Sequence, residues 1–322
     1  MLTRIAARLG RPGLVCAAVA VVAAYARLTE LGPADTGPLD RLDPRQIPAE
    51  WRPAEAPREL VAAVGRPGGW PGDQICSAAV SPDMAWLAAG TRAGCVRLYE
   101  VPSLRLRWEV GGHDGAASAV AFTDNGQALA SGGRDGRIRL WSLGGTPLPA
   151  AGPQPPADSP VLALAGSPDG RRLASAHPSS VRVWDVGPGG PEVTGLIAIP
   201  GCQVAALAFS PDGRRLATGG GDRMVRLWRL GGGRPGPEAV SDEHDGRVYG
   251  LAFAPDGAAV ATLDWQGAVT VWGADGPRPG FGRVLPQVCL AGVFAPDGRH
   301  LLTVNGDGTV WVLRLPRRWS AP

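Results

Sequence analysis

The sequence predicts an all-β fold in which one small four-stranded sheet is repeated six times around a ring, and three observations predict it. A turn of the Ser-Pro-Asp-Gly kind recurs at intervals of 41 to 44 residues. An apolar stretch precedes each turn, and a Leu-Ala-Ser/Thr strand follows it. A strand of the Val-Arg-Leu-Trp kind then closes each copy. A repeat of this length is typical of a single β-propeller, because each sheet buries its faces only against its neighbours.

Two positions set the register of the six copies. The proline position of the first turn is occupied by Pro82, Asp124, Pro168, Pro211, Pro255 and Pro296. The aromatic position of the later strand is occupied by Tyr99, Trp141, Trp184, Trp228 and Trp272, with Leu313 in the sixth copy.

The fourth copy shows why these residues form strands. Val204–Phe209 is almost wholly apolar, as expected of an inner strand covered on both faces. Met224–Trp228 alternates apolar and polar residues, which predicts one buried and one wetter face. In the turn after the inner strand, Pro211 supplies a fixed φ and Gly213 tolerates a positive φ. The turn is therefore a hairpin signal with a physical basis.

The second copy resembles the WD40 repeat family. Gly112 and His113 precede its inner strand, and Ser131, Asp135 and Trp141 follow in order. In that family the His, Ser/Thr, Asp and Trp side chains form a hydrogen-bonded tetrad within one blade. The resemblance implies that His113, Ser131, Asp135 and Trp141 form such a tetrad.

The other copies keep only parts of this set. The fourth keeps Thr218, Asp222 and Trp228 without a histidine. The fifth keeps His244, Thr262 and Trp272, with Gln266 where an aspartate is expected. The sixth keeps Thr303 and Asp307 with Leu313. The first and third lack both the histidine and the aspartate, and the Trp-Asp pair that names the family survives only as Trp184-Asp185.

The last sheet needs a strand from elsewhere in the chain. The sixth copy ends near Arg314, and Leu315–Pro322 is too short and too charged to supply a fourth strand. Resemblance to the family implies that Leu60–Val64, just before the first copy, completes the last blade and removes a free sheet edge. Residues 27–57 hold no seventh copy, so we expect six blades over residues 58–316 and a tail over 317–322.

The amino-terminal segment has a different composition. Three arginines precede the uncharged apolar run Gly13–Ala26, and Ala24-Tyr25-Ala26 has the small-x-small pattern of a cleavage site. Residues 1–26 are therefore expected to be a short apolar helix that serves as a signal peptide or a membrane anchor, with anchoring through residues 13–31. Residues 27–57 form a proline-rich linker. Export or anchoring is favoured, and a cytoplasmic location follows if the segment is an ordinary terminal helix instead.

Charge and cysteine usage exclude several classes of protein. The 32 basic residues are all arginine, and the net charge of +3 is spread along the chain, which argues against nucleic-acid binding. Five cysteines form no framework, so buried free thiols are expected. Cys76 and Cys289 fall in adjacent blades of a closed ring, which leaves a disulfide between them open in an oxidising compartment.

The sequence favours no catalysis, cofactor or metal site. His113 and His244 fall on opposite sides of a six-bladed ring, His177 is expected in a polar turn, and His300 begins a strand. The chain contains no Gly-x-Ser-x-Gly elbow, Cys-x-x-Cys pair or phosphate loop. We therefore expect a protein that is not an enzyme.

Binding of a protein or peptide is the remaining function. The face that carries the turns between second and third strands is where WD40 proteins commonly hold partners, and here it should carry five candidate residues: Arg92, Arg134, Arg223, Arg247 and Trp265. Arginine and tryptophan often concentrate binding energy. The sequence thus predicts a non-catalytic scaffold for an acidic segment, acting as a monomer or in a hetero-complex. The alternatives are an exported ligand-binding or hydrolytic six-bladed propeller, or a regulatory propeller separated from a catalytic partner.

Overall fold

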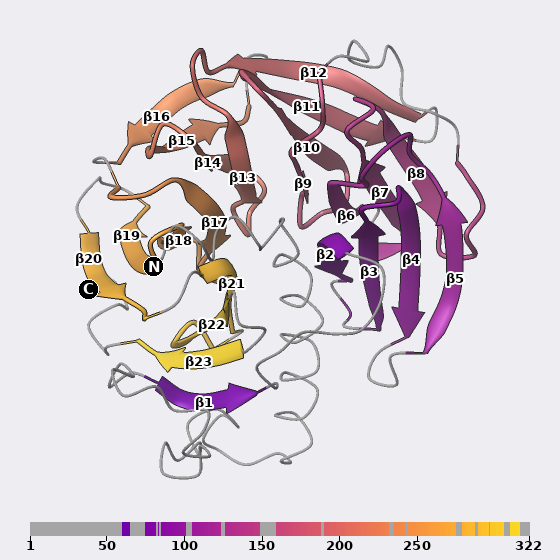
Figure 1. Cartoon of the computed structure of the whole chain (residues 1–322). Helices are drawn as coiled ribbons and strands as arrows, with labels where there is room; N and C mark the ends of the chain where they lie inside the picture. The colour runs from indigo at the N-terminus through magenta and orange to yellow at the C-terminus, as the bar shows by residue number, and fades with distance from the viewer. Residues whose placement is uncertain are drawn as a thin grey trace.

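The computed structural model describes residues 60–64 and 75–315, except for 82, 84, 101–104, 124–125, 149–158, 188–189, 232–234, 242–243, 275–278, 287–288, 296 and 306–309. Within these residues, 23 strands form six antiparallel sheets arranged around a centre (Figure 1). This confirms the all-β class and the repeated sheets. The expected helix of residues 1–26, the linker and the tail lie outside the described residues.

The first three sheets follow the chain in order. The first contains β2 (Ile75–Val80), β3 (Trp86–Thr91), β4 (Cys95–Glu100) and β5 (Leu106–Gly111). The second contains β6 (Ala119–Thr123), β7 (Ala128–Gly132) and β8 (Ile138–Ser142). The third contains β9 (Ala163–Gly166), β10 (Arg172–His177), β11 (Ser180–Gly187) and β12 (Gly190–Ala198). Two of these sheets therefore have the expected four strands, and the second has three within the described part of the chain.

The remaining sheets continue the pattern until the last one. The fourth contains β13 (Val204–Phe209), β14 (Arg215–Gly220), β15 (Val225–Arg229) and β16 (Gly236–Val240). The fifth contains β17 (Val248–Phe253), β18 (Ala259–Asp264), β19 (Ala268–Gly273) and β20 (Pro279–Val284). The sixth contains β21 (Cys289–Phe294), β22 (His300–Asn305), β23 (Val310–Arg314) and β1 (Leu60–Val64), the one strand taken from the other end of the domain.

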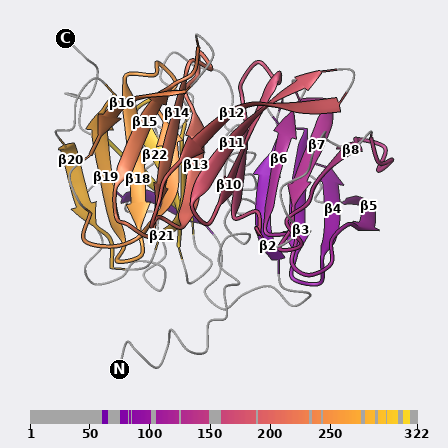
Figure 2. The same cartoon turned by 90° about the horizontal axis from the view of Figure 1, so that it is seen from above.

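The burial of each strand follows its place in the sheet. β7 and β18, the second strands of their sheets, are buried at every position, and most of their residues are small or apolar. Third strands such as β8 and β15 alternate, and outer strands such as β5 and β12 are largely exposed. The core therefore lies between successive sheets. Figure 2 shows the strands of successive sheets running in roughly the same direction, so that their turns gather on two opposite faces.

The turn between the first two strands is held by a side-chain clasp. Ser210 Oγ donates to Asp212 Oδ1 at 2.5 Å, and the same carboxylate accepts the backbone N–H of Arg214 at 3.0 Å. Gly213 follows with a φ of 66°, which a residue with a side chain rarely adopts. The sixth sheet has Ala295 at the serine position. There, His300 Nδ1 donates to Asp297 Oδ2 at 2.7 Å instead.

Backbone pairing between β1 and β23 joins the two ends of the domain. Leu60 pairs with Leu313 and Val64 with Val310 in an antiparallel register, as Figure 1 shows at the sixth sheet. Packing also links each inner strand to the next from β2 through β6, β9, β13 and β17 to β21. β21 and β2 are not in comparable contact. The β1 pairing is therefore a principal connection between the last sheet and the start of the repeats.

The described cysteines, Cys76, Cys95, Cys202 and Cys289, form no disulfide. Cys202 and Cys289 are buried. The disulfide considered between Cys76 and Cys289 is thus not formed in this structure, and Cys16 lies outside the described residues. Among the described residues, no helix has the length and apolar character needed to cross a membrane.

Candidate functional site

We call the face that carries the turns between second and third strands the top face. At the edge of this face, the second sheet contains a hydrogen-bonded relay of four side chains. Trp141 Nε1 donates to Ser131 Oγ at 2.8 Å. Ser131 Oγ lies 2.8 Å from His113 Nε2, and His113 Nδ1 lies 3.0 Å from Asp135 Oδ1. These distances describe a relay from the indole through the hydroxyl and the imidazole to the carboxylate. The structure therefore brings together the four residues that the resemblance grouped.

The electrostatics of this relay favour a neutral imidazole. Burial lowers the pKa of His113 below its usual value, although Asp135 acts in the opposite direction. Burial alone would raise the pKa of Asp135, but hydrogen bonds from the Arg137 backbone, Arg139 and His113 hold that pKa below its usual value. A neutral His113 that donates from Nδ1 and accepts at Nε2 matches Asp135 and Ser131. Arg139 Nη1, which lies 2.9 Å from Nδ1, donates to Asp135 Oδ2. The group serves to hold the loop before β6 against the β7–β8 turn.

The third sheet forms a similar relay from residues that the sequence did not group. Trp184 Nε1 donates to Ser175 Oγ at 2.8 Å, and that oxygen lies 3.0 Å from His177 Nε2. His177 Nδ1 lies 3.3 Å from the Ser159 carbonyl oxygen. The expectation of His177 in a polar turn was wrong, because it is the last residue of β10 and is buried. Residues two apart in a strand share a face, so His177 reaches Ser175 from the same strand.

In the fourth sheet a cysteine takes the place of the histidine. Trp228 Nε1 donates to Thr218 Oγ1 at 3.0 Å, as in the other sheets. Cys202 Sγ donates to Asp222 Oδ1 at 3.2 Å, and Arg226 pairs with the other oxygen of that carboxylate at 2.5 Å. Burial, followed by the hydrogen bond to Asp222, raises the pKa of the Cys202 thiol. Cys202 therefore holds the loop before β13 as a neutral donor.

The fifth sheet corrects the assignment of Gln266. The buried carboxylate of this sheet is Asp264, the last residue of β18. Its oxygens accept the backbone N–H groups of Gly246 at 3.1 Å, Gln266 at 2.8 Å and Ala268 at 2.9 Å. Asp264 thus joins the loop before β17 to the β18–β19 turn. It lies two residues before Gln266, the position at which the family pattern has an aspartate. A search at fixed spacing could not find it.

The rest of the fifth-sheet set is incomplete. Trp272 Nε1 donates to Thr262 Oγ1 at 3.0 Å, and the His244 ring meets the Trp272 ring edge-on with centroids 5.1 Å apart. His244 Nε2 is buried and has no hydrogen-bond partner among the described residues. His244 therefore packs against the tryptophan without entering a relay.

The sixth sheet has no relay among its described residues. Thr303 Oγ1 is buried without a hydrogen-bond partner, and Asp307 lies outside the described residues. Leu313 pairs across the sheet with Leu301 and is buried. A tryptophan, Trp311, pairs directly with Thr303 and is also fully buried, but its Nε1 has no hydrogen-bond partner among the described residues. This sheet is held by apolar packing.

The candidate arginines lie on the top face, as the strand order requires. Arg92, Arg134 and Arg223 occupy the exposed turns β3–β4, β7–β8 and β14–β15. Arg223 has a φ of 65°, the one positive value among the described residues other than glycine. Its carbonyl oxygen accepts the backbone N–H of His244 at 2.8 Å, which ties the fourth-sheet turn to the loop before the fifth sheet. The two outlying arginines, Arg92 and Arg134, belong to the first and second sheets.

Arg247 and Trp265 form a denser group, which we call the Arg-Trp cluster: Gln203, Gly221, Arg247, Tyr249 and Trp265. The Trp265 N–H donates to the Arg247 carbonyl oxygen at 3.0 Å. Arg247 Cζ lies 5.7 Å from the centre of the Tyr249 ring, and the Tyr249 and Trp265 ring centres are 5.4 Å apart. Arg247 Nη2 donates to Gln203 Oε1 at 2.7 Å across the junction of the fourth and fifth sheets. Trp265 is 44% exposed, so the aromatic surface is open to a partner.

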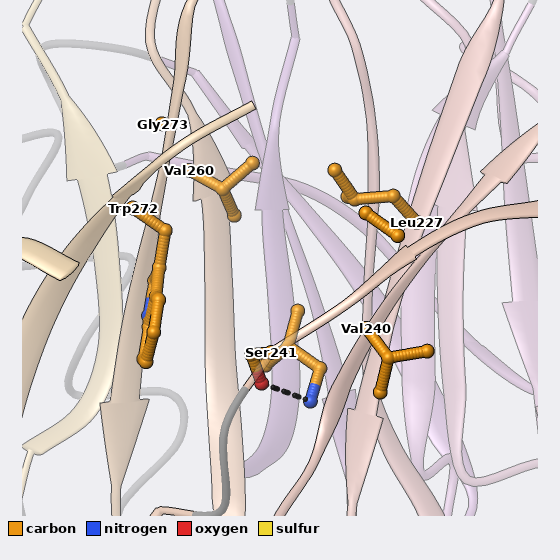
Figure 3. Close-up of a pocket in the computed structure, with 8 residues that line it drawn as sticks. Leu227, Val240, Ser241, Val260, Trp272 and Gly273 are labelled. Atoms are coloured by element: carbon orange, nitrogen blue, oxygen red, sulfur yellow. Dashed lines mark hydrogen bonds between the residues drawn. The ribbon is translucent and has the colours of Figure 1, made fainter. Parts of the chain in front are cut away.

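The cavity in Figure 3 does not provide a substrate pocket. Val225, Leu227, Val240, Ser241, Val260 and Trp272 are among the residues that line it, between the fourth and fifth sheets. Its volume is about 20 Å³, room for a single water molecule, whereas ligand pockets hold several hundred cubic ångströms. Ser241 Oγ, a polar atom at its wall, already accepts the Val225 backbone N–H at 2.9 Å. Within the described residues, no group of three or more potential metal ligands comes together.

Comparison with known families identifies the repeat. The model of the family "WD domain, G-beta repeat" (WD40) matches residues 68–100, 104–142, 154–185, 196–229 and 237–273, which together make up more than half of the chain. The chain therefore belongs to the WD40 repeat family. The five matched segments end before the sixth sheet.

Individual relatives match shorter segments. Small ribosomal subunit protein RACK1y of Oryza sativa subsp. japonica is 31% identical over 107 residues, which are 33% of this chain and 31% of that protein. WD repeat-containing protein 1 of Mus musculus is 36% identical over 102 residues, 31% of this chain and 17% of that protein. These matches thus span a third or less of each relative.

The fold itself extends further than the sequence matches. A chain in a crystal structure of the mitotic checkpoint complex superimposes with a TM-score of 0.66 over 76% of this chain and 75% of that chain, at 24% sequence identity. At that identity the likeness shows the propeller fold alone.

Proposed function

We propose that this WD40 propeller is a non-catalytic scaffold that binds a protein or peptide segment on its top face. The observation that carries the proposal is the contrast between the two kinds of site. The cavity of Figure 3 is far too small for a metabolite, while the top face presents exposed arginines and a half-exposed tryptophan. Buried hydrogen-bonded side chains hold several of the turns that carry them. Rigid turns that carry arginine and tryptophan suit macromolecular binding.

The relatives support the same proposal in general terms. One is named as a protein of the small ribosomal subunit, and one fold neighbour belongs to the mitotic checkpoint complex, so both names place a propeller in an assembly. We extend this to a protein partner here, with an acidic segment as the bound element. We also propose that the segment before the propeller exports or anchors the protein, on the strength of the arginines and the apolar run Gly13–Ala26.

The test is affinity capture from the native host with the Arg134→Glu/Arg247→Glu variant, after membrane and soluble fractions are separated. We expect the wild-type protein to retain a stoichiometric partner and the variant to lose it. The matched control is Arg171→Glu/Arg214→Glu, which reverses two exposed charges in the turns between first and second strands, on the opposite face. Equal capture by both variants would reject the top-face proposal. Reading the amino terminus of the recovered chain by mass spectrometry tests export in the same sample.

A further inference from the structure

The Arg-Trp cluster differs from the other top-face positions because several interactions hold its side chains and backbone in one arrangement. Asp264 accepts three backbone N–H groups from both sides of the cluster, and Trp265 donates its own N–H to Arg247. Gln266 Nε2 adds a hydrogen bond of 3.1 Å to the Asp245 carbonyl oxygen. The turn that carries Trp265 is therefore fixed to the segment that carries Arg247 by main-chain and buried carboxylate contacts.

The guanidinium of Arg247 is positioned but not neutralised. Gln203 Oε1, an uncharged oxygen, is its one hydrogen-bond acceptor among the described residues, and Nε is buried without a partner. Its charge therefore has no carboxylate in contact within the described part of the chain. This differs from Arg139 and Arg226 at the neighbouring relays, which pair with Asp135 and Asp222. A guanidinium held in this way favours an incoming carboxylate, because charge-assisted pairs are the strongest hydrogen bonds available to it.

Gly221 creates the space in which this guanidinium lies. A Cβ at that position would come within 3.1 Å of Arg247 Nη2 and 3.3 Å of Nε. The Gly221 backbone N–H donates to the Gln203 carbonyl oxygen at 3.0 Å. Gly221 is therefore held next to Gln203, the residue whose side chain accepts the hydrogen bond from Arg247. The side chain is thus packed between a glycine of the fourth sheet and the Tyr249 ring of the fifth.

The aromatic half of the cluster supplies the second element of recognition. Tyr249 and Trp265 lie at an interplanar angle of 49°, and Trp265 is exposed on one side. A large aromatic surface of fixed orientation gains contact area with little loss of side-chain entropy. Its natural occupant is an apolar or aromatic side chain next to the residue that pairs with Arg247.

From these contacts we propose that the Arg-Trp cluster is the anchor subsite of the top face and that it takes an acidic residue followed or preceded by an apolar one in an extended peptide. The carboxylate pairs with the free edge of the Arg247 guanidinium, and the apolar side chain packs on Trp265 and Tyr249. The inference rests on the proposed scaffold function, and it assigns the first contact to the junction of the fourth and fifth sheets. Arg92 and Arg134 then act only on longer partners.

The test uses short fluorescein-labelled peptides in which Asp and Glu alternate with Leu and Phe, measured by fluorescence polarisation. Arg247→Ala and Trp265→Ala should each weaken binding by about tenfold or more. Arg171→Ala, in the exposed turn between β9 and β10 on the opposite face, should leave the affinity unchanged. Peptides with Asn and Gln in place of the acids should lose affinity for the wild-type protein but not for Arg247→Ala. Thermal unfolding of each variant shows that the ring is intact.

Two further measurements make the outcome decisive. Arg247→Glu should bind the same peptides with Lys in place of the acids, which a purely structural role for Arg247 does not predict. Oligouridylate serves as the nucleic-acid probe, and binding as tight as that of the acidic peptide would overturn the proposal. Equal peptide affinity in the wild type, Arg247→Ala and Trp265→Ala, or no peptide binding at all, would also overturn it. If the Arg134→Glu/Arg247→Glu variant still lost its partner, the top-face function would stand without this subsite.

Discussion

At the scale of single residues, similar contacts are made by residues at different sequence positions. The loop before an inner strand is held by His113 in the second sheet, by Cys202 in the fourth and by Asp264 in the fifth. In the third sheet His177 contacts the loop before the inner strand, at the Ser159 carbonyl oxygen, from within the second strand. Each solution pairs buried polar groups beside the turn, because a buried polar group left unpaired costs roughly 1–3 kcal/mol. The chemistry is kept while the sequence position changes.

The two histidines before inner strands give a matched pair for testing this. His113→Phe should destabilise the protein by about 2–4 kcal/mol, because it leaves Ser131 and the Asp135 carboxylate without their shared partner. His244→Phe should be neutral or stabilising, because His244 Nε2 is buried without a partner and the edge-on packing against Trp272 can be kept. Urea unfolding of both variants measures the difference. Equal losses would mean that the relay in the second sheet adds nothing beyond packing.

These positions mark the limit of what the sequence reveals. The relay of the second sheet could be named because its four residues stand at the family's spacing. His177 could not be, since its contact with Ser175 comes from two residues sharing one face of a strand, and a spacing rule places it in the turn. Asp264 was passed over for a similar reason. Its carboxylate reaches the turn from the end of β18, and only the backbone geometry shows which N–H groups it meets.

At the scale of elements, the short strand β1 is important for the stability of the sixth sheet. It is five residues long, and its backbone pairs with β23 along the outer edge of the sixth sheet. Without it, β23 would be an unpaired edge in a sheet that also lacks a relay among its described residues. Exposed strand edges invite pairing with other chains. The sixth sheet therefore depends on β1 more than any other sheet depends on its outer strand.

Two truncations separate the role of β1 from that of the segment before it. Removal of residues 1–57 leaves β1 in place and should leave the free energy of unfolding of the propeller unchanged. Removal of residues 1–66 deletes β1 and should lower that free energy by several kcal/mol, since it strips the backbone pairing from the sixth sheet. Chemical denaturation gives the stability, and size-exclusion chromatography reports association through the open edge. Identical unfolding midpoints for the two proteins would contradict the assigned role.

The strands and their order could largely be read from the sequence. The apolar runs and Pro-Asp-Gly turns gave the inner and second strands, because the turn residues dictate a hairpin and the strand residues dictate burial on both faces. The closing strand could be expected because a sixth sheet with three strands needs a fourth. The second sheet has three strands within the described part of the chain, and residues 149–158, where a fourth strand would follow, lie outside it.

At the scale of the whole molecule, three buried histidines make stability depend on pH. Burial lowers the pKa of His113, His177 and His244 below the ordinary value of 6.5. In the unfolded chain these groups take up protons as the pH falls through about 6.5, while in the folded protein they stay neutral to lower pH. The unfolded state then binds more protons, so acid favours unfolding. Above this range the histidine contribution is constant.

We therefore expect the free energy of unfolding to be flat above about pH 7 and to fall below pH 6.5, by up to about 1.4 kcal/mol per pH unit for each histidine. His244→Phe should remove the contribution of one histidine to the dependence of the unfolding free energy on pH. Unlike replacement of His113 or His177, it breaks no relay. The pKa values of Asp135 and Asp222 are lowered in the folded protein from the ordinary value of 3.8. These two carboxylates therefore cause a further loss of folding free energy only as the pH falls below about 3.8. Urea midpoints at pH 7.5, 6.0 and 5.0 measure the profile, and a midpoint independent of pH over this range would contradict it.

The pairing of β1 with β23 also sets the order in which the protein is completed during translation. The strand that leaves the ribosome first pairs with the strand that leaves last, with every other described strand made in between. Successive sheets can form as they emerge, because each inner strand packs on the one made just before it. The sixth sheet can be finished only after the whole domain has left the exit tunnel. Until then β1 has no partner strand. If translation stalls within the last sheet, the earlier sheets can be formed while the ring is still open.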